Sequence, residues 1–174
     1  MADYSALPAI DTSGHITVVV DTPRGSRAKY KYDRECGLFR LSKLLPAGAV
    51  FPGNFGFIPG TRGKDGDEID VLILGHGTLV MGAVVTVRLI GLLNVQQTED
   101  GKTVRNNHLL GVIETNHNPA ELRDIDELHP HHVDEIIHFF TGYNQMEGRQ
   151  FEVLVREDAE AALRYVKINS ETSC

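Results

Sequence analysis

Three aspartates stand within one six-residue segment that directly precedes an apolar run. Asp65, Asp67 and Asp70 fall in the segment 65–70, and the four residues 71–74 that follow are all aliphatic. We expect a tight acidic turn that leads into a buried strand, so that the carboxylates converge where the strand begins. Crowded carboxylates repel one another unless cations lie between them, and Mg²⁺ and Ca²⁺ prefer oxygen ligands. The segment therefore predicts a site for a hard divalent metal.

Two other interpretations of this acidic segment are a solvated turn and a calcium-binding loop. A pair of aspartates beside a strand is more often a solvated turn, but the third acid, Asp70, favours a three-carboxylate metal site. A calcium loop of the EF-hand type would need glycine at its sixth position and glutamate at its twelfth, where this chain has Asp70 and His76. The chain also has no Walker loop and no dinucleotide-binding fingerprint.

The apolar pattern predicts that strands dominate the first two-thirds of the chain. Residues 16–20 are mostly β-branched, and residues 28–32 alternate polar with aromatic side chains, so we expect these two strands to pair. Residues 52–66 are rich in glycine and proline and predict a long loop, and residues 99–102 predict the tip of a hairpin. Further strands are expected at residues 38–41, 69–74, 83–95, 109–114 and 151–155.

Helices are expected only near the end of the chain. Apolar residues recur at helical spacing over residues 132–143 and 158–166, and residues 169–174 predict a loose tail. Many strands followed by two helices indicate an α+β fold, in which the sheet curls into a small closed β-barrel with the helices outside. We expect one domain over residues 1–174, because no linker-like stretch divides the chain.

Composition excludes several classes of protein. The chain has 174 residues, a formal net charge of −7 and no block of Lys and Arg, which argues against nucleic acid as a partner. Its apolar runs are too short or too often interrupted to span a bilayer. Two cysteines, Cys36 and Cys174, make a poor disulfide framework, and residues 1–10 lack the features of a signal peptide. These observations predict a cytoplasmic protein.

Five segments together resemble the family I soluble inorganic pyrophosphatases. They are residues 18–23, 24–30, 51–58, 65–72 and 138–140, and they fall in that family's order and spacing over nearly the whole chain. The resemblance implies an OB-like closed barrel with two flanking C-terminal helices. It also implies Mg²⁺ dependence, hydrolysis of pyrophosphate to two phosphates by in-line attack of an activated water, and a homohexamer.

The resemblance also implies roles for individual residues. Asp67 matches the general base that assists the attacking water. Asp65 and Asp70 match metal ligands, and Asp67 is counted with them as a metal-site residue. Lys29, Lys43 and Tyr143 match residues that hold phosphate, although Lys43 stands where the family has an arginine. Metals would neutralise the charge of the polyanionic substrate and lower the pKa of a water.

Several matched positions depart from the family pattern. Asp21 stands for a glutamate, and Lys31 stands for an acidic residue, which reverses the charge there. Phenylalanines replace tyrosines, and neutral residues replace two further metal-binding aspartates and two lysines. These positions are Phe51, Phe55, Phe57, Gln97, Asn106, His108 and Asn144. A pocket with fewer carboxylates holds fewer cations, so we expect impaired or altered catalysis.

Three functions remain open from the sequence. The first and favoured one is a metal-dependent pyrophosphatase. The second is a catalytically depleted homologue that acts as a structural, regulatory or anion-binding protein. The third is a hydrolase of another phosphoanhydride.

The histidines add little to the choice between these functions. His108 would favour Mn²⁺ or Zn²⁺ over Mg²⁺ if it faced the site, but a lone histidine is more often structural. We expect the same of His129, His131 and His132, which stand at the start of a predicted helix.

Overall fold

Eight strands precede the helices in the part of the protein that the computed structural model describes, residues 3–64, 66–75, 77–115 and 121–170, and a ninth strand lies between the two long helices. The strands are β1 (Ile16–Thr22), β2 (Ala28–Asp33), β3 (Leu38–Leu44), β4 (Asn54–Phe57), β5 (Asp70–Leu74), β6 (Val84–Glu99), β7 (Lys102–Arg105), β8 (His108–Ile113) and β9 (Gln150–Glu157). The helices are α1 (Pro130–Met146) and α2 (Ala159–Asn169), with a short 3₁₀ helix, η1 (Ile125–Glu127), before them. This order confirms the predicted α+β class.

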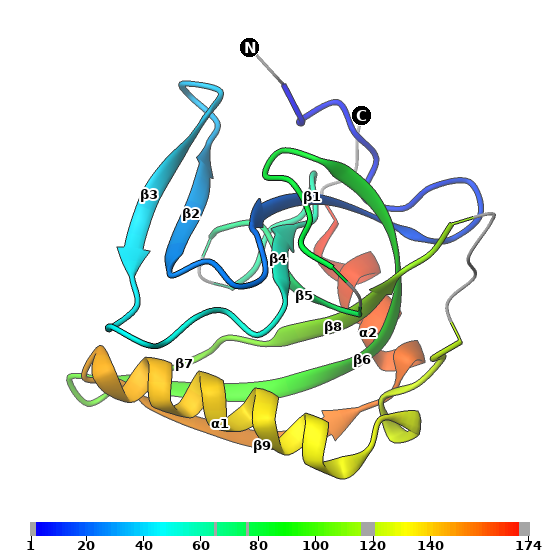
Figure 1. Ribbon diagram of the computed structural model, residues 1–174. Coiled ribbons are helices and arrows are strands. Elements are labelled where there is room, and N and C mark those ends of the chain that lie inside the picture. The colour runs from blue at the N-terminus through cyan, green and yellow to red at the C-terminus, as the bar shows by residue number, and fades with distance from the viewer. Residues whose placement is uncertain (1–2, 65, 76, 116–120, 171–174) are drawn as a thin grey trace.

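Five of the strands close into a ring. β1 pairs with β4 on one side and β6 on the other, β4 pairs with β5, β5 with β8, and β8 with β6 (Figure 1). The β5–β8 pair is parallel and the other four pairs are antiparallel. Because every strand of the ring has two neighbours, the ring itself has no free edge. The predicted small closed barrel is confirmed.

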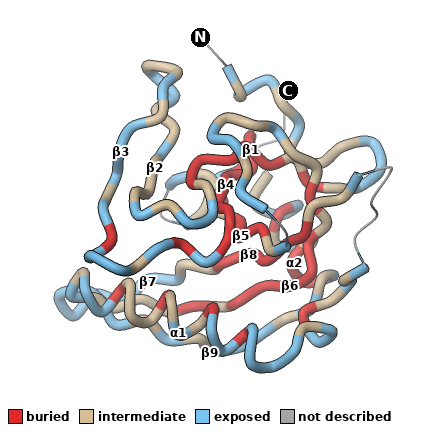
Figure 2. The backbone as a smooth tube through the Cα atoms, in the orientation of Figure 1, coloured by how far each residue is buried: buried red, intermediate tan, exposed pale blue. Residues whose placement is uncertain are grey.

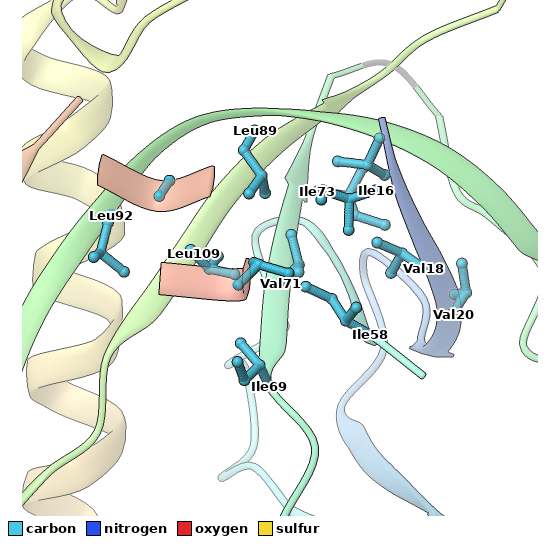
Figure 3. Packing of buried hydrophobic residues seen from close by; sticks show 13 residues of the cluster. Ile16, Val18, Val20, Ile58, Ile69, Val71, Ile73, Leu89, Leu92 and Leu109 are labelled. Carbon is cyan, nitrogen blue, oxygen red and sulfur yellow. The ribbon is translucent and has the colours of Figure 1, made fainter. Parts of the chain in front are cut away.

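Both faces of the barrel wall are buried, which explains the nearly continuous apolar runs. Successive side chains of a strand point to opposite faces. Val71 and Ile73 therefore join the cluster inside the barrel, while Leu72 between them joins a second cluster outside it. Figure 2 shows the buried segments concentrated on the barrel strands, and Figure 3 shows the interior cluster.

The long strand β6 connects the barrel to the rest of the fold. Its first half pairs with β1 and β8, and its second half carries β7 and β9. The pairing with β8 shifts register between Leu89 and Gly91. A side chain at Gly91 would meet the Cβ of Ile125 at 2.7 Å, so only glycine lets η1 pack this closely.

Each of the two long helices begins at a capping side chain. His129 caps α1 by accepting a hydrogen bond from the backbone N–H of His131, and Pro130 occupies the first turn. Asp158 caps α2 by accepting from the backbone N–H of Ala161 at 2.7 Å. The structural interpretation of the histidines is thus confirmed for His129. In the described ranges, no helix combines the length and apolar character that crossing a membrane requires.

The two helices cover different parts of the barrel. α1 packs along β9 (Figure 1). Its residues Val133, Ile136 and Phe140 belong to the outer cluster. α2 packs against β6 and contributes Ala162 and Val166 to the interior cluster. Both helices therefore bury an apolar face against strands, as amphipathic helices do.

Two local predictions were wrong. β1 and β2 do not pair, because β2 pairs with β3 in a separate two-stranded sheet and β1 pairs with β4 and β6. The predicted loop 52–66 contains β4, whose four residues are all buried in the barrel wall. Burial of that kind overrides the turn propensity of glycine and proline.

The short elements β7 and η1 were not predicted. The hairpin tip at 99–102 is confirmed, with Asp100 and Gly101 at φ 50° and 74°. Of the predicted tail, residues 171–174 lie outside the described residues.

Candidate active site

A cavity of about 460 Å³ lies where the β2–β3 hairpin, the barrel mouth and α1 meet. Two groups of polar side chains line it, a charged cluster and an amide cluster. The charged cluster consists of Asp21, Lys29, Lys31, Asp67 and Asp70. The amide cluster consists of Gln97, Asn106 and Asn144.

Lys29 and Asp70 form the inner ion pair of the charged cluster. Lys29 lies on β2 and Asp70 opens β5, and the Lys29 Nζ is 3.3 Å from the Asp70 Oδ2. The Lys29 side chain is only 13% exposed. Burial lowers the pKa of Lys29, but the carboxylates of Asp70 and Asp21 more than offset this and raise it. Lys29 therefore remains a fixed positive charge in the cavity wall.

Asp21 is the most deeply buried acid of the cluster. It lies on β1 and is 3% exposed, and its Oδ1 finds no hydrogen-bond partner among the described residues. Burial, followed by repulsion from Asp70, raises the pKa of Asp21 to about 7. A buried carboxylate oxygen with this environment is suited to a cation or to a proton.

Lys31 pairs with Asp67 at the outer side of the cluster. It follows Lys29 by two positions on β2, so both lysines point to the same face of the strand. The Lys31 Nζ is 2.5 Å from the Asp67 Oδ2. The carboxylate of Asp67, the predicted general base, is therefore in direct contact with a positively charged group.

Lys43 and Tyr143 lie together at another part of the wall. The Lys43 ammonium is 2.7 Å from the carboxylate of Glu147 and 5.0 Å from the centre of the Tyr143 ring. The Tyr143 hydroxyl is buried and makes no hydrogen bond within the described ranges. Both groups could donate to a phosphate oxygen that enters the cavity. Glu147 was not foreseen, and a glutamate just past a predicted helix is too common a feature to have revealed it.

The amide cluster is connected by its own hydrogen bonds. Asn106 donates to the side-chain oxygen of Gln97 at 3.1 Å, and Gln97 donates to that of Asn144 at 3.0 Å. Asn144 in turn donates to the backbone carbonyl of Phe140 at 2.8 Å. These side chains are neutral and already paired. They form a rigid polar wall that carries no charge to attract a cation.

His108 lies between the two clusters as a buried, uncharged ring. It stacks on Phe140 with the ring centres 4.3 Å apart, and its Nε2 finds no hydrogen-bond partner among the described residues. Burial is the main cause that lowers the pKa of His108 to about 4, although Asp70 opposes it. The ring is therefore neutral at pH 7. It lines the cavity, and the structural role that the sequence favoured stays a prediction.

Phenylalanines supply the apolar part of the cavity wall. Phe51, Phe55 and Phe57 are all buried, and the rings of Phe51 and Phe55 meet edge to face with centres 5.3 Å apart. The Lys29 ammonium lies 5.5 Å from the centre of the Phe55 ring. Phenyl rings offer no hydrogen-bonding atom, so this wall shapes the cavity without binding phosphate through hydroxyls.

The structure brings most of the predicted site residues to this one cavity. Asp67, Asp70, Lys29, Lys43 and Tyr143 all line it. Asp65, the third predicted metal ligand, lies outside the described residues. Among the residues that are described, no three His, Cys, Asp or Glu side chains are close enough to share one metal ion. Two further acids stand at the predicted hairpin tip: Glu99 lines the cavity but pairs with Arg149 at 3.0 Å, and Asp100 sits at the tip itself.

Comparisons with known proteins agree with this geometry. Residues 18–172 match the family model described as inorganic pyrophosphatase. The inorganic pyrophosphatase of Thermus thermophilus is 34% identical, over 96% of this chain and 95% of its own. The crystal structure of an inorganic pyrophosphatase from that organism superposes with a TM-score of 0.85 at 33% identity, covering 95% of both chains. The inorganic pyrophosphatase of Helicobacter pylori gives a TM-score of 0.84 at 29% identity over 94% of this chain and 96% of its own. The OB-like α+β barrel is therefore the fold of these enzymes, and the chain belongs to the inorganic pyrophosphatase family.

Proposed function

We propose that this protein hydrolyses inorganic pyrophosphate to two phosphates with the help of a divalent cation. Family membership supports the reaction, because the relatives described above are named inorganic pyrophosphatases. The observation that carries the proposal is the charged cluster, which puts two carboxylates and two ammonium groups, Asp67, Asp70, Lys29 and Lys31, in one cavity. A pyrophosphate hydrolase needs cations to hold a polyanion and acids to hold the metal and activate water.

The residues present fit a divalent cation. Asp21 keeps a buried carboxylate oxygen without a partner among the described residues, and repulsion from Asp70 contributes to its raised pKa. A cation between such carboxylates would relieve that repulsion, and oxygen ligands suit a hard metal. Asp70 and Asp67 would hold the ion, together with Asp65. When bound, it would supply positive charge to the substrate oxygens and lower the pKa of a nearby water.

The side chains of the cavity would then have different roles in the reaction. Asp67 accepts a proton from water, whose oxygen attacks one phosphorus atom in line with the bridging oxygen. The bond from that phosphorus to the bridging oxygen breaks, and the bridging oxygen leaves with the second phosphate. Lys29, Lys43 and Tyr143 donate hydrogen bonds to the phosphate oxygens and hold the substrate in line. Lys43 has to exchange its contact with Glu147 for the substrate, and Lys31 has to release Asp67.

The other two functions left open by the sequence have less support. Each relative described above is named a pyrophosphatase, and nothing in the comparisons favours a catalytically depleted homologue. The neutral amide cluster would lower the number of cations held without removing the charged cluster. A preference for another phosphoanhydride would appear in a substrate panel that includes tripolyphosphate and nucleotides.

Phosphate release from pyrophosphate tests the proposed function. The purified protein should release phosphate in the presence of Mg²⁺, Mn²⁺, Zn²⁺ or Co²⁺ and should be inactive in EDTA. Asp67→Asn should lower kcat at least about 100-fold, because amide cannot accept the proton. Asp100→Asn is the matched control, since Asp100 lies at the hairpin tip and asparagine tolerates its positive φ. An Asp67→Asn protein as fast as its parent would remove the assigned base, and no turnover with any metal would refute the function.

Three finer expectations belong to the same proposal. We propose that Mg²⁺ is the physiological cation, that the protein acts in the cytoplasm and that it self-associates as a homohexamer. Exposed leucines on β3, Leu38, Leu41 and Leu44, are suited to contacts between copies. The net charge of −7 also supports the expectation that nucleic acid is not a partner. Light scattering coupled to gel filtration measures the assembly, and a monomeric mass would contradict it.

A further inference from the structure

Lys31 is the member of the charged cluster whose role remains unassigned. It lies on β2 two residues after Lys29, lines the cavity, and contacts the Asp67 carboxylate at 2.5 Å. The two lysines differ in exposure, because the Lys29 side chain is 13% exposed and that of Lys31 is 52% exposed. Lys31 can therefore change partners without disturbing the core, whereas Lys29 is fixed by the wall around it.

The charge balance of the cluster shows what Lys31 does in the free protein. Three carboxylates, of Asp21, Asp67 and Asp70, face two ammonium groups, of Lys29 and Lys31. Lys29 is paired with Asp70, and Lys31 compensates the carboxylate of Asp67. Without Lys31, the contact between an ammonium group and the Asp67 carboxylate is lost, and that carboxylate attracts a bound cation more strongly. A lysine is well suited to this exchange, because its charge is compact and its four-carbon chain is flexible.

We propose that Lys31 is a resident cation of the site that competes with divalent metal for Asp67 and moves to the phosphate oxygens when a polyanion enters. In the free protein it neutralises Asp67 and weakens metal binding there. In the complex it releases Asp67 and donates to the substrate, so that the release of the base is coupled to substrate binding. The second half of this inference rests on the proposed function, and the first half does not.

Metal binding without substrate tests the first half. Calorimetric titration with Mn²⁺ should show that Lys31→Gln binds the ion roughly tenfold more tightly than the parent, because one nearby positive charge is gone. Lys31→Arg keeps the charge and should bind Mn²⁺ like the parent. Lys102→Gln is the matched control, because Lys102 is an exposed lysine on β7 that does not line the cavity. A Lys31→Gln protein whose Mn²⁺ affinity stays within twofold of the parent would overturn the competition.

Binding of imidodiphosphate, a diphosphate with a nitrogen bridge, tests the second half. At saturating Mn²⁺, Lys31→Gln should bind this compound roughly tenfold more weakly than the parent, and Lys31→Arg should retain most of the affinity. Equal affinities in Lys31→Gln and the parent would overturn the phosphate contact. The two proposals fail separately. A parent protein that does not turn over pyrophosphate refutes the proposed function, while unchanged Mn²⁺ affinity in Lys31→Gln refutes only the role of Lys31.

Discussion

The charged cluster and the amide cluster line the same cavity but differ in charge and in how their polar groups are paired. The charged cluster contains a buried carboxylate oxygen without a partner in the described ranges, and one of its ion pairs is half exposed. The amide cluster is neutral, and its side chains are joined by hydrogen bonds of 3.0 and 3.1 Å. The first is arranged to respond to ions, and the second to hold its shape. Substitutions should therefore affect ligand binding and catalysis in the charged cluster and mainly stability in the amide cluster.

The largest expected effect comes from Asp70 in the charged cluster. Asp70→Asn should lower kcat/KM by roughly 100-fold to 1,000-fold, because it weakens metal binding and removes the partner of the buried Lys29. Phosphate release across a range of Mg²⁺ concentrations is the measurement. Asp134→Asn is the control, since Asp134 forms an exposed ion pair with Arg156 on the surface and such pairs contribute little. Activity of Asp70→Asn within threefold of the parent would show that the charged cluster is not the reactive part of the cavity.

His108 should make stability depend on pH in the absence of metal. Its pKa is about 4 when folded and near 6.5 when unfolded, so the unfolded state binds more protons between these values. The free energy of unfolding therefore loses roughly 2–3 kcal/mol from this residue as pH falls from about 6.5 to 4.

Denaturant unfolding in EDTA between pH 4 and 7 measures this dependence. The raised pKa of Asp21 acts in the opposite direction, because the folded state keeps a proton that the unfolded state has lost as pH rises toward about 7. The difference between the parent and His108→Phe isolates the histidine. His132→Gln, at an exposed position in the first turn of α1, should keep the slope of the parent. Identical slopes in the parent and His108→Phe would contradict the buried neutral ring.

Asn144 tests the structural role of the amide cluster. Asn144→Ala should lower the free energy of unfolding by about 2 kcal/mol, because the side chain is buried and its hydrogen bonds with Gln97 and the Phe140 carbonyl are lost. The KM for pyrophosphate should stay within about threefold, since the amide carries no charge to bind the substrate. A large rise in KM with unchanged stability would show that this cluster binds ligand directly.

A double substitution can give the amide cluster negative charge like that of the charged cluster. Gln97→Asp with Asn106→Asp would place two carboxylates where the family pattern has metal-binding aspartates. We expect Mn²⁺ affinity to rise by about threefold, together with a small loss of stability in EDTA from repulsion between the new charges. Calorimetry and thermal unfolding with and without Mn²⁺ measure both effects. Unchanged Mn²⁺ binding would show that the cations are confined to the charged cluster.

Much of the fold could be predicted because local patterns carried it. The apolar runs at residues 16–20 and 71–74 mark strands that are mostly buried, and Asp158 marks the start of α2. β4 escaped prediction because its residues 54–57 stand among glycines and prolines, and only burial in the barrel wall makes them a strand. The pairing of β2 with β3 rather than β1 likewise depends on closure of the ring, which leaves no free edge on β1.

The sequence by itself determined the family, the acids and lysines of the charged cluster, and the positions where charge or hydroxyl is missing. Only the tertiary structure decided which of these groups meet. Lys31 pairs with Asp67 across 36 positions, Gln97 with Asn144 across 47, and Lys43 with Glu147 across 104. The periodicity of apolar residues and the propensity for helix or strand depend on a few neighbouring residues. These pairs form because the closed barrel, the hairpin and α1 bring distant segments to one cavity.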